Sequence, residues 1–214
     1  NTKHLRSTVL ELSSAGENKQ AIRVALDMFE EAGSVEKLPA EQRALVAGTA
    51  VRFGDKKYIK QLMEEYTESQ NSEVRETIVA ALCSTRNPEV AKQIIDWGLA
   101  PKTGAVRQQD IAHWFAYLMR NYHTRPVIWE WLTNNWDYLS DLFGDGKSIE
   151  YLIWYASGPL STPVWQEKFE TFFTPMLKDA ALKRNVKIAF GEIAARVAWR
   201  KREESSLKKF FQDQ

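Results

Sequence analysis

Residues 107–143 read RQQDIAHWFAYLMRNYHTRPVIWEWLTNNWDYLSDLF and form the stretch densest in apolar and aromatic residues. In its first half, apolar side chains recur at steps of 3, 4, 7, 8 and 11 residues, a spacing that places them on one face of an α-helix. They are Ile111, Trp114, Phe115, Leu118, Met119 and Tyr122. The pattern predicts an amphipathic helix with all six side chains on its buried face.

The second half of this stretch predicts another helix. It restarts after Thr124-Arg125-Pro126, with proline in the first turn, where its missing N–H removes no hydrogen bond. Val127, Ile128, Trp131 and Leu132 then form its apolar face. The two helices make an αα-hairpin that cannot bury its apolar faces alone, because one stripe covers the other only in part. Further hairpins are therefore expected on either side.

The rest of the chain repeats this pattern. Helix starts are marked by Asp55, by Asn71 or Ser72, by Asn87 and by Thr162, and Gly33 stands just after the end of a helix. The apolar residues near the N-terminus, Leu5, Val9 and Leu12, mark a short first helix that stops at Gly16.

The C-terminal segment predicts a long helix with Leu182, Val186, Ala189, Ile193 and Val197 inward, followed by a short helix through Leu207 and Phe210. The basic run 200–202 would then stand in the last turn of the long helix, where positive charge is favourable.

The fold class predicted by these patterns is all-α. About eleven helices are expected, with helix starts about every 15 to 18 residues and hairpins about every 35, the spacing of an irregular HEAT- or armadillo-like helical-hairpin solenoid. Residues 98–106 hold Pro101 and Gly104 without a periodic apolar face, which predicts a soft hinge inside a single domain, 1–214.

Composition excludes several classes of protein. A hydrophobic share of 44% with eight tryptophans excludes a disordered chain, and the apolar runs are too short for a membrane span. The net charge of +1 gives no electrostatic reason to expect nucleic acid as a partner. A soluble, globular chain is expected, without a nucleic-acid or membrane partner.

No catalytic or metal-binding residues are predicted within the 214 residues. The three histidines, His4, His113 and His123, do not form the i, i+4 pair of a zinc peptidase helix. The single Cys83 lies on an apolar helical face, where a buried inert thiol is expected. The sequence also lacks a phosphate-binding glycine loop and a nucleophile elbow.

Two polar residues of the central stretch are candidates for ligand contact. His113 lies on the polar side of the first helix, where it is either a solvated residue at the edge of the core or a side chain pointing into a cleft. Arg107 precedes that helix and is followed by Gln108, Gln109 and Asp110. This polar group suits helix capping. The same geometry would also allow Arg107 to hold the carboxylate of a peptide.

Two blocks of sequence, 80–99 and 107–139, resemble the C-terminal helical domain of zinc aminopeptidases of the aminopeptidase N and puromycin-sensitive type. In that family the first block has the form A-L-x-C-T-x-x-P, and the second has R-x-Q-D, a helix, a turn leading to tryptophan, and N-W. This sequence departs from the first block at Ser84, which stands between Cys83 and Thr85. The matching positions are Ala81, Leu82, Cys83, Pro88, Arg107, Gln109, Asp110, Trp129, Asn135 and Trp136.

The resemblance implies a multidomain metallopeptidase that releases N-terminal residues from peptides. Its zinc site, His-Glu-x-x-His with a distant Glu, would lie upstream of this chain, so zinc belongs to the parent enzyme. A start at Asn1 rather than methionine also favours a fragment. The chain itself would be a non-catalytic domain that caps the active-site chamber, gates access to it and contacts the distal part of the peptide.

By this resemblance the partners are the upstream catalytic domain of the same chain and peptide substrates, and Arg107 and His113 are expected to face the chamber. The lack of glycosylation sequons and the single cysteine favour a cytoplasmic parent. The alternative hypothesis is a free-standing HEAT-like scaffold that binds a partner protein. It is motivated by the solenoid spacing of the helices and by the absence of catalytic groups from the sequence.

Overall fold

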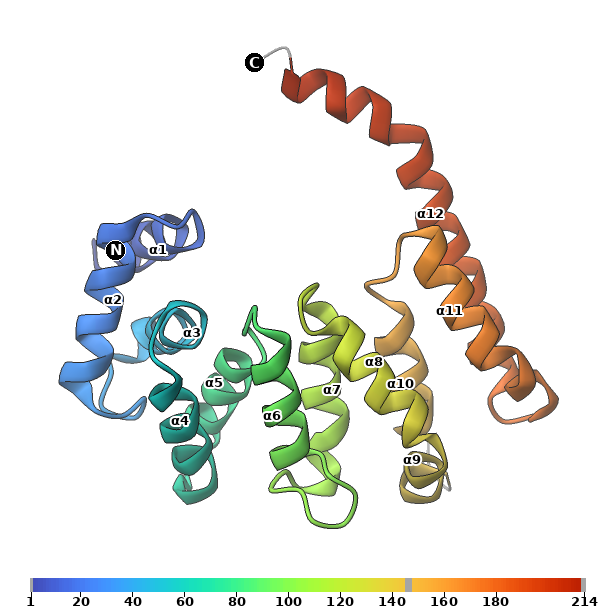
Figure 1. Cartoon of the computed structure of the whole chain (residues 1–214), viewed down its shortest axis with the longest axis horizontal. Helices are drawn as coiled ribbons and strands as arrows, with labels where there is room; N and C mark the ends of the chain where they lie inside the picture. Colours follow the sequence, from blue (N-terminus) through green and yellow to red (C-terminus); the bar gives the residue numbers. More distant parts are fainter. Residues whose placement is uncertain (1, 145–147, 213–214) are drawn as a thin grey trace. The chain divides into compact units, whose positions relative to one another are not determined.

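The computed structural model describes residues 2–144 and 148–212, and the side chains of all of these except residues 2–4, 6 and 148. Every regular element in these residues is helical, which confirms the all-α class (Figure 1). The α-helices are α1 (Thr2–Ala15), α2 (Lys19–Ala32), α3 (Arg43–Phe53), α4 (Lys56–Glu68), α5 (Ser72–Leu82), α6 (Pro88–Gly98), α7 (Ile111–Arg120), α8 (Arg125–Asn134), α9 (Trp136–Phe143), α10 (Ser148–Ser157), α11 (Pro163–Phe173) and α12 (Lys183–Gln212). Three short 3-10 segments are η1 (Ala40–Gln42), η2 (Gln108–Asp110) and η3 (Thr174–Lys178).

The described part of the chain holds twelve α-helices, one more than the eleven expected. The segment after Pro126 is not one helix, because it breaks at Asn135 into α8 and α9. None of the helices in the described residues is both long and apolar enough to cross a membrane.

Four predicted helix starts and one predicted helix end are confirmed by their caps. The side chains of Asp55, Asn71, Asn87 and Thr162 each accept a hydrogen bond from a backbone N–H in the first turn of α4, α5, α6 and α11, respectively. At the end of α2, Gly33 adopts φ 68° and its N–H donates to the carbonyl of Phe29, the left-handed cap that glycine adopts without strain.

The helices form two compact units. Unit 1 comprises residues Asn1–Arg107 and Asn121–Ile128, and unit 2 comprises Gln108–Arg120 and Trp129–Gln214. The first boundary follows directly after the segment 98–106, which the sequence marks as a hinge. The hinge motion itself, the single-domain description and the HEAT-like solenoid stay predictions.

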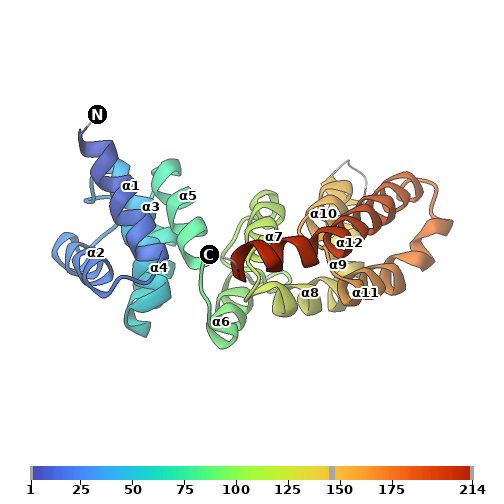
Figure 2. The same ribbon diagram turned by 90° about the horizontal axis from the view of Figure 1, so that it is seen from above.

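In unit 1, α3 is the central helix. It packs against α2 and α5, and residues 45–51 are all buried. A helix that is apolar on all sides is typical of the interior of a helical array, where neighbours cover each face. The three helices can be followed in Figures 1 and 2.

The connection between α2 and α3 is held by a carboxylate from α4. Glu65 accepts hydrogen bonds from the backbone N–H groups of Val35, at 3.0 Å, and Glu36, at 3.1 Å, one on each carboxylate oxygen. The Val35 side chain is fully buried, so this bidentate contact fixes an apolar residue of the loop against the core.

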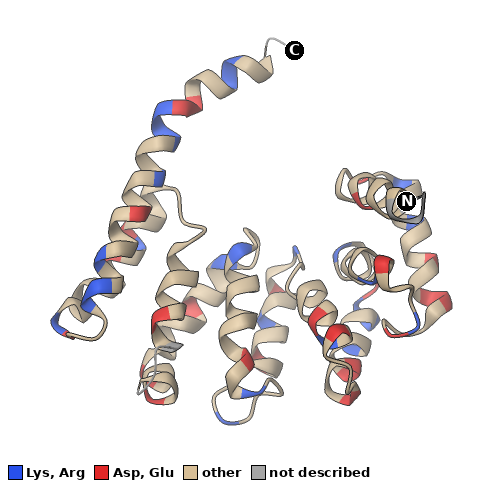
Figure 3. Cartoon of the chain, turned by 180° about the vertical axis from the view of Figure 1, so that it is seen from behind, with Lys and Arg blue, Asp and Glu red and all other residues tan. Residues whose placement is uncertain are grey.

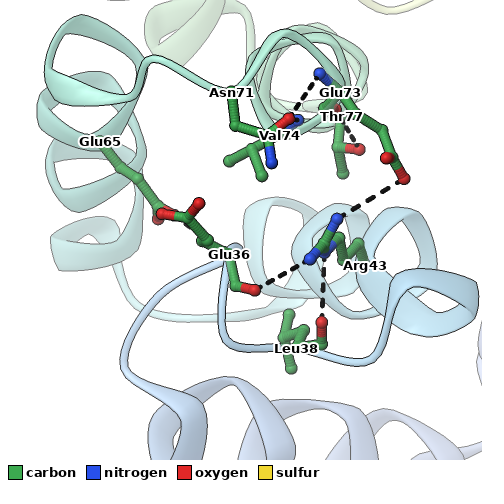
Figure 4. A network of polar contacts seen from close by, with 8 residues as sticks. All are labelled: Glu36, Leu38, Arg43, Glu65, Asn71, Glu73, Val74 and Thr77. Carbon is green, nitrogen blue, oxygen red and sulfur yellow. Dashed lines mark hydrogen bonds and ion pairs between the residues drawn. The ribbon is translucent and has the colours of Figure 1, made fainter.

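Arg43, the first residue of α3, holds the same loop from the other side (Figure 4). Its Nε donates to the carbonyl of Leu38 at 3.1 Å and its Nη2 to the carbonyl of Glu36 at 2.9 Å. Its Nη1 lies 3.5 Å from a carboxylate oxygen of Glu73 in α5, and its side chain is only 14% exposed. One guanidinium thus ties the loop, α3 and α5 together.

In unit 2, α10 packs against both α7 and α12, and α11 packs against α12. Five of the six side chains predicted on the inner face of α7 are buried. They are Ile111, Trp114, Phe115, Leu118 and Met119. Aromatic rings of α8, α9 and α11 form a second cluster, in which the Trp136 and Phe173 ring centroids are 5.2 Å apart at an interplanar angle of 89°.

The prediction for Tyr122 is wrong, because its side chain is 74% exposed. α7 ends at Arg120, and Asn121 begins a turn in which its side-chain amide donates to the carbonyls of Cys83 and Thr85, at 2.9 and 2.7 Å. Tyr122 therefore lies beyond the helix, where helical spacing no longer determines its direction.

The first helix ends at Ala15, directly before Gly16 as predicted, but its apolar residues point outward. Leu5, Val9 and Leu12 are 64%, 54% and 68% exposed, whereas Ser7 and Ser14 are buried. The hydroxyl groups of both serines have no hydrogen-bond partner among the described atoms. The apolar face of α1 is thus turned away from the other helices of unit 1.

At the C-terminal end the predicted long and short helices are one continuous helix, the thirty-residue α12. The basic run 200–202 therefore lies inside the helix and not in its last turn. Basic and acidic residues follow one another along this part of α12 (Figure 3), and Lys208 Nζ lies 2.8 Å from Glu204 Oε1, one helical turn away.

Replacing Arg43 by methionine, which keeps the apolar stem but removes the guanidinium, is expected to lower the free energy of unfolding by about 2 kcal/mol, since two carbonyls lose a charged donor. Urea denaturation followed by circular dichroism measures the change. Arg23→Met is the matched control, because the Arg23 side chain is 85% exposed. Equal effects of the two substitutions would contradict the assigned role of Arg43.

Candidate functional site

The described residues contain no group of three or more histidine, cysteine, aspartate and glutamate side chains arranged to hold a metal ion. Cys83 is 2% exposed, and burial, with a smaller contribution from the Glu76 carboxylate, raises the pKa of its thiol well above the ordinary value. The thiol is therefore protonated at neutral pH and is not an activated nucleophile.

The two candidate residues from the sequence both lie on the surface. Arg107 is exposed and is the last residue of the first segment of unit 1, directly before η2. His113 is exposed on α7 in unit 2, and its ring packs edge-to-face on Tyr117 with centroids 4.9 Å apart. Neither residue lines the two grooves described next. Their place in a peptide chamber stays a prediction.

The first groove lies between α10 and α12 and has a volume of about 230 Å³. We call it the α10/α12 groove. Its floor is apolar, with Ile153 and Ala189 buried, and its rim carries the half-exposed rings of Tyr151 and Trp154. The remaining lining residues are Glu150, Ser157, Asn185, Ile188 and Glu192. This groove combines aromatic faces with two carboxylates.

The second groove lies between α8, α9 and α11 and has a volume of about 900 Å³. We call it the α8/α11 groove. Aromatic rings form one side of it, and the ring of Phe172 lies 6.0 Å from that of Trp129 and 5.7 Å from that of Trp136. Its charged lining residues, Asp137, Glu167 and Lys168, have mixed sign, so the groove selects no particular ligand charge.

Arg196 of α12 contacts Ser157 and Glu192, two of the residues that line the α10/α12 groove. Its Nε donates to the carbonyl of Leu160 and its Nη2 to the carbonyl of Ser157, both at 2.9 Å. Its Nη1 also lies 3.6 Å from the Glu192 carboxylate. Because Ser157 ends α10, the guanidinium stands where a helix terminus carries partial negative charge. Arg196 therefore fixes the separation of the two helices that form the groove.

Sequence reasoning did not find the groove residues Glu150, Tyr151 and Trp154. They lie outside the buried apolar stripe of α10, which is formed by Ile149, Leu152, Ile153 and Ala156. The signal that was available is the pair of aromatic residues at i and i+3 outside the apolar stripe, since large aromatic side chains on a polar face often mark an interaction surface.

The arrangement of the described helices defines the class of the protein, an all-α helical module. It belongs to the ERAP1-like C-terminal domain family, whose model matches residues 1–195. This membership agrees with the resemblance found in the sequence blocks 80–99 and 107–139.

Individual relatives are aminopeptidases. Aminopeptidase N of Lactobacillus helveticus is 26% identical over 195 residues, which are 90% of this chain and 23% of that protein. Aminopeptidase M1-A of Oryza sativa subsp. japonica is 29% identical over 204 residues, 91% of this chain and 22% of that protein. Glutamyl aminopeptidase of Homo sapiens is 22% identical over 213 residues, 98% of this chain and 22% of that protein. The chain spans about a quarter of the length of these relatives.

Replacing Arg196 by methionine is expected to lower the midpoint of thermal unfolding by about 5 °C, because about 2 kcal/mol of charged hydrogen bonding to two carbonyls is lost. Differential scanning calorimetry measures the midpoint. Arg200→Met is the control, because Arg200 is exposed and lies one turn further along α12. The anchoring role fails if Arg196→Met unfolds at the same temperature as the control.

Proposed function

We propose that this chain is the non-catalytic C-terminal domain of a zinc aminopeptidase, in which it caps the active-site chamber, gates access and holds the distal part of the peptide. The observation that carries the proposal is the family match over residues 1–195. The relatives named above are aminopeptidases in which the matching region is about a quarter of the chain. The catalytic step would then belong to the remainder of a longer polypeptide.

The outward face of α1 supports a partner surface in that longer polypeptide. Leu5, Val9 and Leu12 stand at i, i+4 and i+7, so they form one exposed apolar stripe, while two serines are turned inward. An amphipathic helix with its apolar face outward is stabilised when that face is covered. We infer that the catalytic domain of the same polypeptide covers it.

The described part of the chain offers no cluster of metal ligands. Zinc would be held by the upstream domain, where it would polarise the scissile carbonyl and activate water. The contribution of this chain is physical: it would limit the size of the peptides that reach the chamber and exclude bulk water from it. A cytoplasmic location of the parent remains part of the proposal.

The native polypeptide that contains this chain is expected to release N-terminal residues from short peptides and to leave the N-terminus of a folded protein intact, because a capped chamber admits only chains that fit inside. Chelation of zinc should abolish the activity and added zinc should restore it. Product analysis by mass spectrometry measures both. A native polypeptide without aminopeptidase activity would overturn the proposal and favour a free-standing binding scaffold.

Within the proposal, Arg107 and His113 face the chamber and contact the distal part of long peptides. Replacing either by alanine in the native polypeptide should lower kcat/KM about threefold to tenfold for long peptides, the loss expected for one exposed polar or charged contact. Hydrolysis of a single amino-acid amide should not change, since this substrate does not reach the two side chains.

The matched control is Lys92→Ala, which removes an exposed charge from α6. Kinetics measured on a series of peptides with the same N-terminal residue and increasing length separate the outcomes. Unchanged kinetics on long peptides, or an equal loss on the amide, would remove Arg107 and His113 from the peptide path.

A further inference from the structure

We propose that the α10/α12 groove is a binding site for a lysine or arginine side chain presented by a peptide. The site goes beyond the proposed function, because it rests on the groove alone and its test requires no peptidase activity. Nothing in the family match or in the names of the relatives assigns a ligand to these residues.

The first argument is the geometry of the groove. α12 contributes Asn185, Ile188, Ala189 and Glu192, which share one helical face by their i, i+3, i+4 and i+7 spacing. α10 packs alongside α12 and contributes the opposite wall. The volume of about 230 Å³ lies below the roughly 300–1,000 Å³ of pockets for drug-sized ligands, so the groove suits a single side chain.

The second argument is the position of the aromatic rings. Tyr151 is 51% and Trp154 57% exposed, so both offer ring surface to a ligand. The ring of Tyr155 stacks on Tyr151 with centroids 6.2 Å apart and lies 5.4 Å from that of Trp154. Tyr155 thus supports both rings from behind, which lowers the entropy lost when a ligand binds. Aromatic faces of this kind attract cations.

The third argument is charge. Among the residues that the structure describes, the charged ones that line the groove are the carboxylates Glu150 and Glu192. Glu192 is close to Arg196, at 3.6 Å, whereas Glu150 has no ion-pair partner within the described part of the chain. Glu150 is therefore the main anionic partner for an incoming cation.

Lysine and arginine side chains match all three features. Their aliphatic stems pack on apolar surface while the charged end stays at the rim, so the stem would lie on Ile188, which is 48% exposed, and the cation beside Glu150. Trp154 would then cover the cation with its ring. Arginine is expected to bind more tightly than lysine, because its planar guanidinium stacks on aromatic rings and pairs with a carboxylate through two N–H groups. An acidic side chain would be repelled.

The test is a titration of the 214-residue chain with the blocked tripeptide acetyl-Gly-Arg-Gly-amide and with the same peptide carrying citrulline, the neutral isostere of arginine. Amide and indole NMR signals of α10 and α12 report binding at the groove. The arginine peptide is expected to bind about tenfold more tightly than the citrulline peptide, and its advantage should shrink with added salt.

Glu150→Gln should reduce the affinity for the arginine peptide to that for the citrulline peptide, and Trp154→Ala should weaken both. Glu167→Gln, which removes an exposed carboxylate from the α8/α11 groove, is the matched control and should change neither. Circular dichroism confirms that each variant is folded; all three substitutions lie on exposed or half-exposed positions, so folding is expected to persist.

The proposal is overturned by equal affinity for the arginine and citrulline peptides, by an arginine affinity that Glu150→Gln leaves unchanged, or by signals that shift only outside α10 and α12. Absence of binding at millimolar peptide overturns it as well. A negative result in the peptide titration would leave the aminopeptidase proposal standing, because the two proposals are tested on different polypeptides with different readouts.

Discussion

The structure depends on one constraint: an amphipathic helix must have its apolar face covered, and a pair of helices cannot cover both of its own faces. α3 satisfies the constraint completely, since α2 and α5 pack against it and residues 45–51 are buried. α10 satisfies it between α7 and α12. Where a neighbour is missing among the described residues, apolar side chains stay exposed, as on α1. The binding surfaces proposed for the chain lie where the helices leave apolar or aromatic side chains exposed.

Sequence patterns predicted the features that depend on local chemistry. The caps at Asn71 and Asn87 and the buried face of α7 could be predicted because hydrogen bonding to the first turn and helical spacing act over a few residues. The sequence patterns failed where contacts between residues far apart in the sequence determine the local structure. Tyr122 was misplaced because Asn121 ends α7 by bonding to the carbonyls of Cys83 and Thr85, which lie far away in the sequence. Likewise, the spacing of Leu5, Val9 and Leu12 defines a face but does not say toward which neighbour that face turns.

The same distinction explains the candidate site. Arg107 and His113 were selected as polar residues beside the densest apolar stretch, and the structure places both on exposed positions. The α10/α12 groove was not found, because it joins residues from two helices about 35 positions apart, which Arg196 links through its hydrogen bonds to Leu160 and Ser157. A groove between helices is a property of packing, so composition and periodicity within one helix do not reveal it.

The central claim is that this helical module serves a catalytic domain in the same polypeptide. The most direct measurement is the full amino-acid sequence of the native polypeptide that contains this chain, read from its encoding frame. The account predicts a His-Glu-x-x-His motif with a distant glutamate on the N-terminal side of the module. A native polypeptide without that motif would contradict the account, and the chain would then be a binding scaffold that shares only the fold of the family.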